Sequence, residues 1–224
     1  EGDRLGYFSF PGATGDPTFP EVFVKMVDAR GAPAPYGGHA WVFHSSLTDF
    51  AYTLKVLDTQ TGRIRTYETV GSRPLTCGVA DTSAFQRSCL GEESSEAPPG
   101  TRLAAPSGPD LSLLNGRFRA TIRATDPRTG RIAEGAAIPR ADGFGYFSLP
   151  AFTGDPRFPE IFVKMVDGRA QPGRSFWVFY TGLTDLAYTL TVTDTVTGAV
   201  RTYAGGATAG TSLCGSADTS AFRD

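Results

Sequence analysis

The sequence contains two copies of one pattern. Segments that begin at Gly6, Phe23, Trp41 and Ala80 return with few changes at Gly145, Phe162, Trp177 and Ala217. The copies are offset by 139 residues at Gly6 and by 136 at Trp41, so only short insertions separate them. Self-similarity of this kind indicates two copies of one folding unit, and it constrains the fold more than any other feature.

The second copy predicts seven short strands. Phe118, Ala120 and Ile122 alternate with polar residues within 116–126, which is typical of a half-buried strand. Six further strands are expected over 131–139, 143–149, 160–167, 175–180, 186–195 and 199–203. Turn signals separate them, and no segment has a sustained helical period. We therefore predict an all-β protein made of two tandem antiparallel immunoglobulin-like β-sandwich domains.

The first copy begins at the third of these strands, so in this chain it lacks the first two. We predict three parts: a first, N-terminally incomplete repeat over 1–89, a Pro/Ser/Gly-rich linker over 90–113, and a second repeat over 114–224. We interpret the chain as part of a longer protein. A sandwich without two strands exposes strand edges and apolar surface, which upstream residues or another chain would cover.

Composition limits the partners. The net charge is −2 without any basic cluster, which argues against binding to nucleic acid. No apolar run approaches the roughly 18 residues that span a bilayer, so membrane insertion is not expected. The sequence has no cofactor motif, and we predict no cofactor.

Cys77 and Cys89 are predicted to form a disulfide. They flank the repeated segment that begins at Ala80, and neither belongs to a CxxC metal pattern. A bond across so short a loop would stabilise the fold by roughly 3 kcal/mol and would favour an extracellular or periplasmic setting. Free thiols in a cytosolic protein are the alternative, and Cys214 has no assigned partner.

No catalytic or metal-binding residues are predicted. The two histidines, His39 and His44, are replaced by Ser175 and Tyr180 in the second copy, so the repeated unit has no histidine-based site. Acidic residues do recur, and a glycosidase pair or a calcium loop would use such carboxylates. We expect several of them to cap turns instead.

Aromatic residues form the candidate ligand site. Trp41, Trp177 and Tyr180 could stack against sugar rings, although aromatic residues in strands more often fill a core. Lys25 and Lys164 are expected to face solvent as charges on strand edges.

Several motifs together carry a family resemblance. They are Asn115-Gly-Arg-Phe118, Gly145-Tyr-Phe147, Phe162-Val-Lys-Met-Val-Asp167, Trp177-Val-Phe-Tyr180, Gly182-Leu-Thr-Asp185 and Tyr188-Thr-Leu-Thr-Val-Thr-Asp194. With them the chain resembles a repeated extracellular β-sandwich domain of secreted multidomain bacterial proteins. The resemblance implies an extracellular β-sandwich module and supplies no catalytic residues.

The leading hypothesis is a non-enzymatic structural or adhesive module of a bacterial extracellular or cell-surface protein. Its sharper form is a filament subunit assembled by strand complementation, with other copies of itself or neighbouring domains as partners. The alternative is a carbohydrate-binding accessory module that binds surface glycans through exposed aromatic residues. An enzyme that uses the repeated carboxylates is a third hypothesis.

Overall fold

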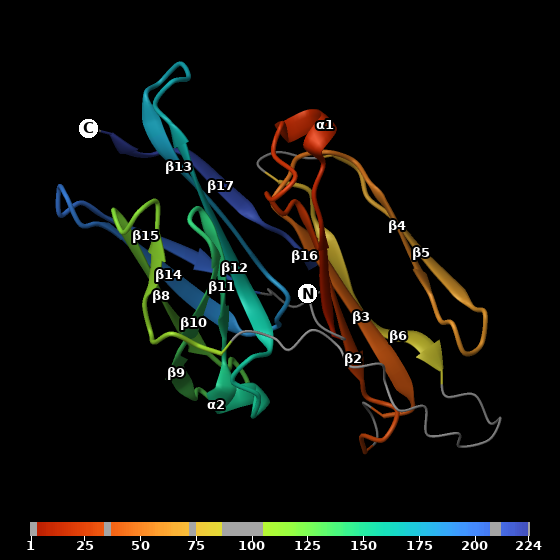
Figure 1. Ribbon diagram of the computed structural model, residues 1–224. Helices are drawn as coiled ribbons and strands as arrows, with labels where there is room; N and C mark the ends of the chain where they lie inside the picture. The colour runs from red at the N-terminus through yellow and green to blue at the C-terminus, as the bar shows by residue number, and fades with distance from the viewer. Residues whose placement is uncertain (1–3, 34–36, 72–74, 87–104, 207–211, 224) are drawn as a thin grey trace. The chain divides into compact units, whose positions relative to one another are not determined.

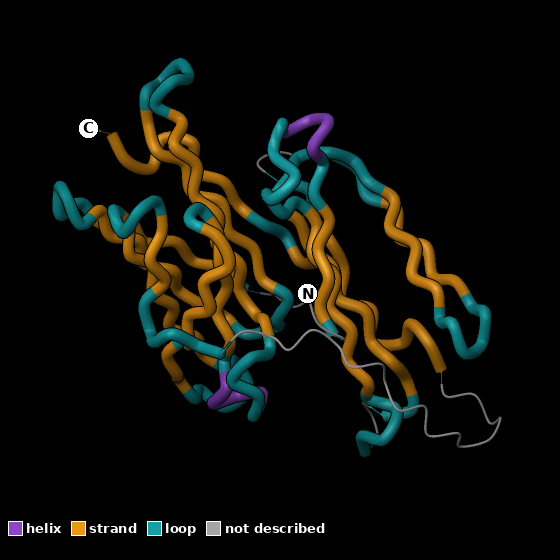
Figure 2. The backbone as a smooth tube through the Cα atoms, viewed as in Figure 1, coloured by secondary structure: helices purple, strands orange, loops and turns teal. Residues whose placement is uncertain are grey.

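The protein is built almost entirely from strands. The computed structural model describes residues 4–33, 37–71, 75–86, 105–206 and 212–223. Strands make up 55% of it and helices 4%, so the all-β prediction is confirmed (Figure 2). The chain divides into two compact units, Glu1–Leu103 and Ala104–Asp224, each of which is described by itself.

The second unit contains two antiparallel sheets (Figure 1). One has the order β10 (Ala136–Ala141), β11 (Phe144–Ser148), β12 (Pro159–Gly168), β13 (Ser175–Gly182) and β17 (Ser216–Arg223). The other has the order β15 (Val200–Gly205), β14 (Ala187–Asp194), β8 (Phe118–Thr125) and β7 (Leu111–Leu113), and β9 (Ile132–Glu134) also pairs with β8. The short β16 (Ser212–Leu213) precedes β17.

Strand β8 supplies one side of the core of the second unit. Its alternating residues Phe118, Ala120, Ile122 and Ala124 are at most 1% exposed. They share one apolar cluster with residues of the other sheet, including Val163 on β12. Because alternate side chains of a strand point to one face, the apolar face of β8 packs against the other sheet, as in a β-sandwich.

Two details differ from the predicted strands. The segment expected as one strand over 131–139 is split into β9 and β10, which belong to different sheets. The chain changes sheets at Gly135, where an added Cβ would lie 3.0 Å from the Ile122 Cβ and 3.1 Å from the Phe147 Cδ1. Strands β7 and β17 were also not predicted, since β7 is short and β17 lacks an apolar alternation.

The first unit contains only part of this arrangement. Strands β1 (Leu5–Phe8), β2 (Val22–Asp28), β3 (His39–Ser46) and β6 (Gly78–Gln86) form an antiparallel sheet. Strands β4 (Thr53–Leu57) and β5 (Ile64–Glu68) form a separate hairpin. These six strands correspond to β11, β12, β13, β17, β14 and β15, and the described residues of the first unit contain no counterpart of β7 to β10.

Each unit also has a one-turn helix that the sequence did not predict. These are α1 (Pro11–Thr14) and α2 (Pro150–Thr153), and each begins with proline and ends before a left-handed glycine. Neither of these helices, the only ones in the described ranges, is long and apolar enough to cross a membrane.

The second unit begins before Leu114. Strand β7 precedes that residue, and Ser107 N donates to the carbonyl oxygen of Ala137 at 2.8 Å. The first part of the predicted linker, 90–104, lies outside the described residues, as does Cys89.

Candidate functional site

The repeated aspartates cap turns. Asp16 and its counterpart Asp155 accept hydrogen bonds from the backbone N–H two residues later, at 2.8 and 2.9 Å. Asp81 and Asp218 accept the same bond at 2.9 Å each, but they lie within strands β6 and β17. The expected role in turns is therefore confirmed at Asp16 and Asp155.

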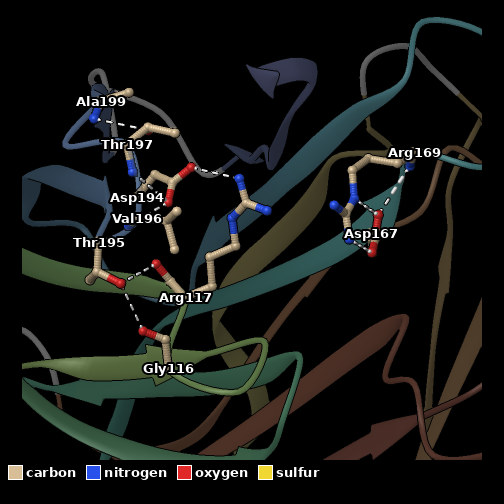
Figure 3. A network of polar contacts seen from close by, with 9 residues as sticks. All are labelled: Gly116, Arg117, Asp167, Arg169, Asp194, Thr195, Val196, Thr197 and Ala199. Carbon is tan, nitrogen blue, oxygen red and sulfur yellow. Dashed lines mark hydrogen bonds and ion pairs between the residues drawn. The ribbon is translucent and has the colours of Figure 1, made fainter. Parts of the chain in front are cut away.

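A second pair of aspartates is held by arginines. Asp167 accepts hydrogen bonds from Arg169 Nε and NH2 at 2.9 and 2.7 Å (Figure 3). Asp28 and Arg30 repeat this contact at 2.8 Å for both nitrogens. The arginine hydrogen bonds lower the pKa of Asp28 and of Asp167 to about 2. A general acid needs a raised pKa, so these carboxyl groups have the opposite of that property.

In the second unit, an ion pair with a buried carboxylate lies at the start of β8. Arg117, just before β8, donates to Asp194 Oδ2 at 3.0 Å, and the Asp194 side chain is fully buried (Figure 3). The Arg117 guanidinium also lies 4.2 Å from the centre of the Phe176 ring. Thr195 Oγ1 donates to the carbonyl oxygen of Arg117 at 2.9 Å. These contacts fix the start of β8 to the turn after β14.

The first unit has a histidine in its core. The fully buried His44 places Nδ1 3.0 Å from the Tyr52 hydroxyl, and its ring centre is 5.1 Å from that of Tyr67. Tyr67 donates to Asp81 Oδ2 at 2.9 Å. Loss of hydration lowers the pKa of His44 to about 4. Ser46 Oγ donates to the carbonyl oxygen of Thr76 at 2.7 Å.

The candidate stacking residues lie in different environments. Trp41 and Trp177 are half-buried, whereas Tyr180 is 7% exposed and its ring packs 5.2 Å from that of Tyr203. Tyr180 is therefore a core residue. Trp177 lies against Gly168, where an added Cβ would approach its Cε2 to 2.4 Å, so part of the indole is covered.

The two lysines expected in solvent are buried. Lys25 and Lys164 are 3% and 4% exposed, and their Nζ atoms lie 4.9 and 5.0 Å from the ring centres of Phe43 and Phe179. The aromatic faces provide favourable contacts for the ammonium groups. The prediction of solvent-facing edge charges is wrong.

The disulfide differs from the predicted one. Cys77 is bonded to Cys214, so it is not available to Cys89. The prediction of a Cys77–Cys89 bond relied on sequence spacing, which does not determine which cysteines come within bonding distance. The bond closes a loop of 137 residues, from 214 − 77, for which chain entropy gives roughly 5 kcal/mol of stabilisation.

The first unit leaves part of its core open. We call Val24, Met26, Ala40 and Val56, together with the outer edge of β4, the acceptor face. All four residues are half-buried and pack against Val42, Ala84 and Phe85. Their counterparts in the second unit are Val163, Met165, Phe176 and Val192, which are 0–1% exposed. The acceptor face is therefore the surface that β8 covers in the second unit.

A pocket lies next to this face. It has a volume of about 540 Å³, and its lining includes Ala84 and Phe85. The counterpart of Phe85 is Phe222, whose ring centre lies 5.1 Å from that of Phe118 in the second unit. The ring of Phe118 also packs against that of Phe176, with the centres 4.9 Å apart, and the first unit has the smaller Ala40 at the position of Phe176.

The acceptor face could be found from the sequence only through the repeat, because alignment of the copies shows which strands the first one lacks.

Among the described residues, no group of three or more His, Cys, Asp or Glu side chains gathers as a metal site. Comparison with protein-family models, curated proteins and solved structures finds no match to this chain.

Proposed function

We propose that the protein is a non-enzymatic structural or adhesive module of a bacterial extracellular or cell-surface protein, and that it assembles into filaments by strand complementation. The acceptor face of the first unit is the observation that supports this proposal. Apolar residues that are fully buried in one copy stay half-exposed in the other, and another strand can cover them. Strand addition of this kind gives both backbone hydrogen bonds and pockets for alternate side chains.

Two further observations support this role. The Cys77–Cys214 disulfide is consistent with an extracellular setting, since disulfides persist in oxidising compartments. Among the aspartates that recur in both copies, Asp16 and Asp155 cap turns and Asp28 and Asp167 pair with arginine, which are structural roles.

Electron microscopy of native material, without a recombinant fragment, tests the proposal. We expect ordered fibres whose repeat is close to the length of one or two units. Discrete particles that dissociate on dilution into a stable, folded monomer would contradict it.

Binding to carbohydrate is the second candidate function. It is favoured by Trp41 and Trp177, which occupy equivalent half-buried positions on β3 and β13. A glycan array probed with the native chain and with the Trp41→Ala and Trp177→Ala variants tests it. The candidate fails if no glycan binds, or if binding survives both substitutions.

A further inference from the structure

The turn between β7 and β8 has three successive residues in the left-handed region. Leu114, Asn115 and Gly116 have φ angles of 50°, 56° and 80°. The Arg117 N–H donates to the carbonyl oxygen of Leu114 at 3.1 Å, so Asn115 and Gly116 are the central residues of a type I′ turn. Because a residue with a branched side chain is strained in this region, other contacts must hold Leu114 in place.

Hydrogen bonds anchor the turn on both sides. Asp142 accepts bonds from Leu114 N at 2.7 Å, through its carbonyl oxygen, and from Asn115 N at 2.6 Å, through Oδ1. Thr195 Oγ1 donates to the carbonyl oxygen of Gly116 at 3.1 Å (Figure 3). Among the described residues, neither the carbonyl oxygen of Asn115 nor the N–H of Gly116 has a hydrogen-bond partner. The peptide plane that joins these two residues can therefore rotate while its flanks stay anchored.

Rotation of this plane brings the Gly116 nitrogen towards the Asn115 side chain. It converts the type I′ turn into a type II′ turn, which also has positive φ at its first central residue. Asn115, with a φ of 56°, already has the sign that both turns need. In the type II′ arrangement the Gly116 nitrogen lies on the same side as the Asn115 Cβ, so a five-membered ring can close between this nitrogen and Cγ.

We propose that Asn115 is a site of spontaneous deamidation through a succinimide. The Gly116 nitrogen loses its proton and bonds to Asn115 Cγ, and the side-chain amide group leaves as ammonia. Water then opens the ring at either carbonyl carbon, which gives aspartate or isoaspartate at position 115. The Asn115 side chain is exposed to water, and Gly116 has no Cβ that would shield the attacking nitrogen. Asn115 is also the only asparagine in the sequence.

The products disturb the contacts that anchor β7. Isoaspartate continues the chain through the former side chain, so it adds a carbon atom to the turn that the bond from Arg117 to Leu114 closes. Either product places a carboxylate beside Asp142, whose Oδ1 accepts the N–H of the modified residue, and like charges repel. Since Leu111 and Leu113 of β7 are fully buried, looser anchoring of this strand exposes part of the core. Deamidation is therefore expected to destabilise the second unit.

Mass spectrometry of the full chain during incubation at physiological temperature tests the proposal. The fragment that contains residue 115 is expected to gain the mass difference between a carboxylic acid and an amide, and an isoaspartate-specific methyltransferase is expected to label it. A synthetic peptide of residues 110–120 gives the rate without the fold. The folded chain is expected to react within about a hundredfold of this rate, because the peptide plane is free to rotate. Slower reaction, or aspartate without isoaspartate, would overturn the proposal.

A variant that cannot cyclise links the reaction to stability. Asn115→Gly keeps a residue that adopts positive φ, but it has no side chain for the Gly116 nitrogen to attack. In a Trp41→Phe background, Trp177 fluorescence reports denaturant unfolding of the second unit. The unfolding midpoint of the chain with Asn115 is expected to fall as isoaspartate accumulates, and that of Asn115→Gly is expected to stay constant. Equal falls in both chains would contradict the assigned effect on β7.

The same dipeptide placed in a strand tests the role of the turn. Asp167→Asn creates a second Asn-Gly sequence within β12, where Gly168 pairs with Ser175. Because the ladder holds this peptide plane in place, deamidation at position 167 is expected to be more than about tenfold slower than at Asn115. Equal rates at the two positions would overturn the inference that the free peptide plane of the turn directs the reaction.

Discussion

The buried His44 makes the stability of the first unit depend on pH. Its pKa is about 4 in the folded chain, below the ordinary value of 6.5. The contribution to stability is therefore complete above pH 6.5 and is lost as the pH falls towards 4. Since one pKa unit corresponds to 1.36 kcal/mol, we expect the free energy of unfolding to fall by about 2.5 kcal/mol between pH 7.5 and pH 4.5. The neighbouring Tyr52, whose pKa burial raises to about 12, does not titrate in this range.

Denaturant titration measures this loss. The fluorescence of Trp41 in a Trp177→Phe background reports unfolding of the first unit. The matched variant His44→Tyr introduces the residue of the second copy, and we expect it to remove the loss of about 2.5 kcal/mol that His44 causes. Full pH dependence in His44→Tyr, or an NMR titration of His44 that gives a pKa near 6.5, would contradict the role assigned to the buried His44.

Three further outcomes are expected. Phe118→Ala should destabilise the second unit by about 3 to 5 kcal/mol in denaturant titration, because it leaves a cavity in a fully buried core, and a loss below about 1 kcal/mol would contradict that packing. Asp194→Asn should cost about 3 to 5 kcal/mol, because it breaks an ion pair whose carboxylate is fully buried and leaves the half-buried Arg117 without this counterion. Asp58→Asn should cost less than about 1 kcal/mol, and equal losses from the two variants would contradict the difference between the two turns. After cleavage at a protease site inserted within 90–100, the chain should run as one band on a non-reducing gel, also with Cys89→Ser. Cys214→Ser should give two fragments, and two bands from the unaltered chain would disprove the assigned disulfide.

The strands with clear alternation could be predicted from sequence. Residues 118–125 alternate because one face enters the core, and their burial confirms it. Strand β17 could not be predicted in this way, because its buried residues Ala221 and Phe222 are adjacent and do not alternate with exposed ones. Side-chain hydrogen bonds add to its backbone pairing with β13. Tyr203 donates to Asp218 Oδ2 at 2.9 Å, and Ser175 Oγ donates to the carbonyl oxygen of Thr219 at 2.7 Å. Such contacts leave no periodic signal.

The candidate site was only partly predictable. The repeat predicted an incomplete first copy, but it did not indicate the pocket beside Phe85, which depends on how β5 and β6 approach each other. Residue type alone did not separate Tyr180, a core residue, from the half-buried Trp177. The pairing of Cys77 with Cys214 depends on which cysteines lie within bonding distance in the folded chain, and the spacing of cysteines in the sequence does not show this.

Hydrogen exchange along β4 in native material tests the acceptor face most directly. Amides on the outer edge of Thr53–Leu57 should exchange slowly in the native assembly and become fast in the purified chain of 224 residues. Slow exchange in both samples would mean that the chain of 224 residues itself covers the edge of β4. Fast exchange in both samples would mean that no strand is added to the edge of β4 in the native assembly.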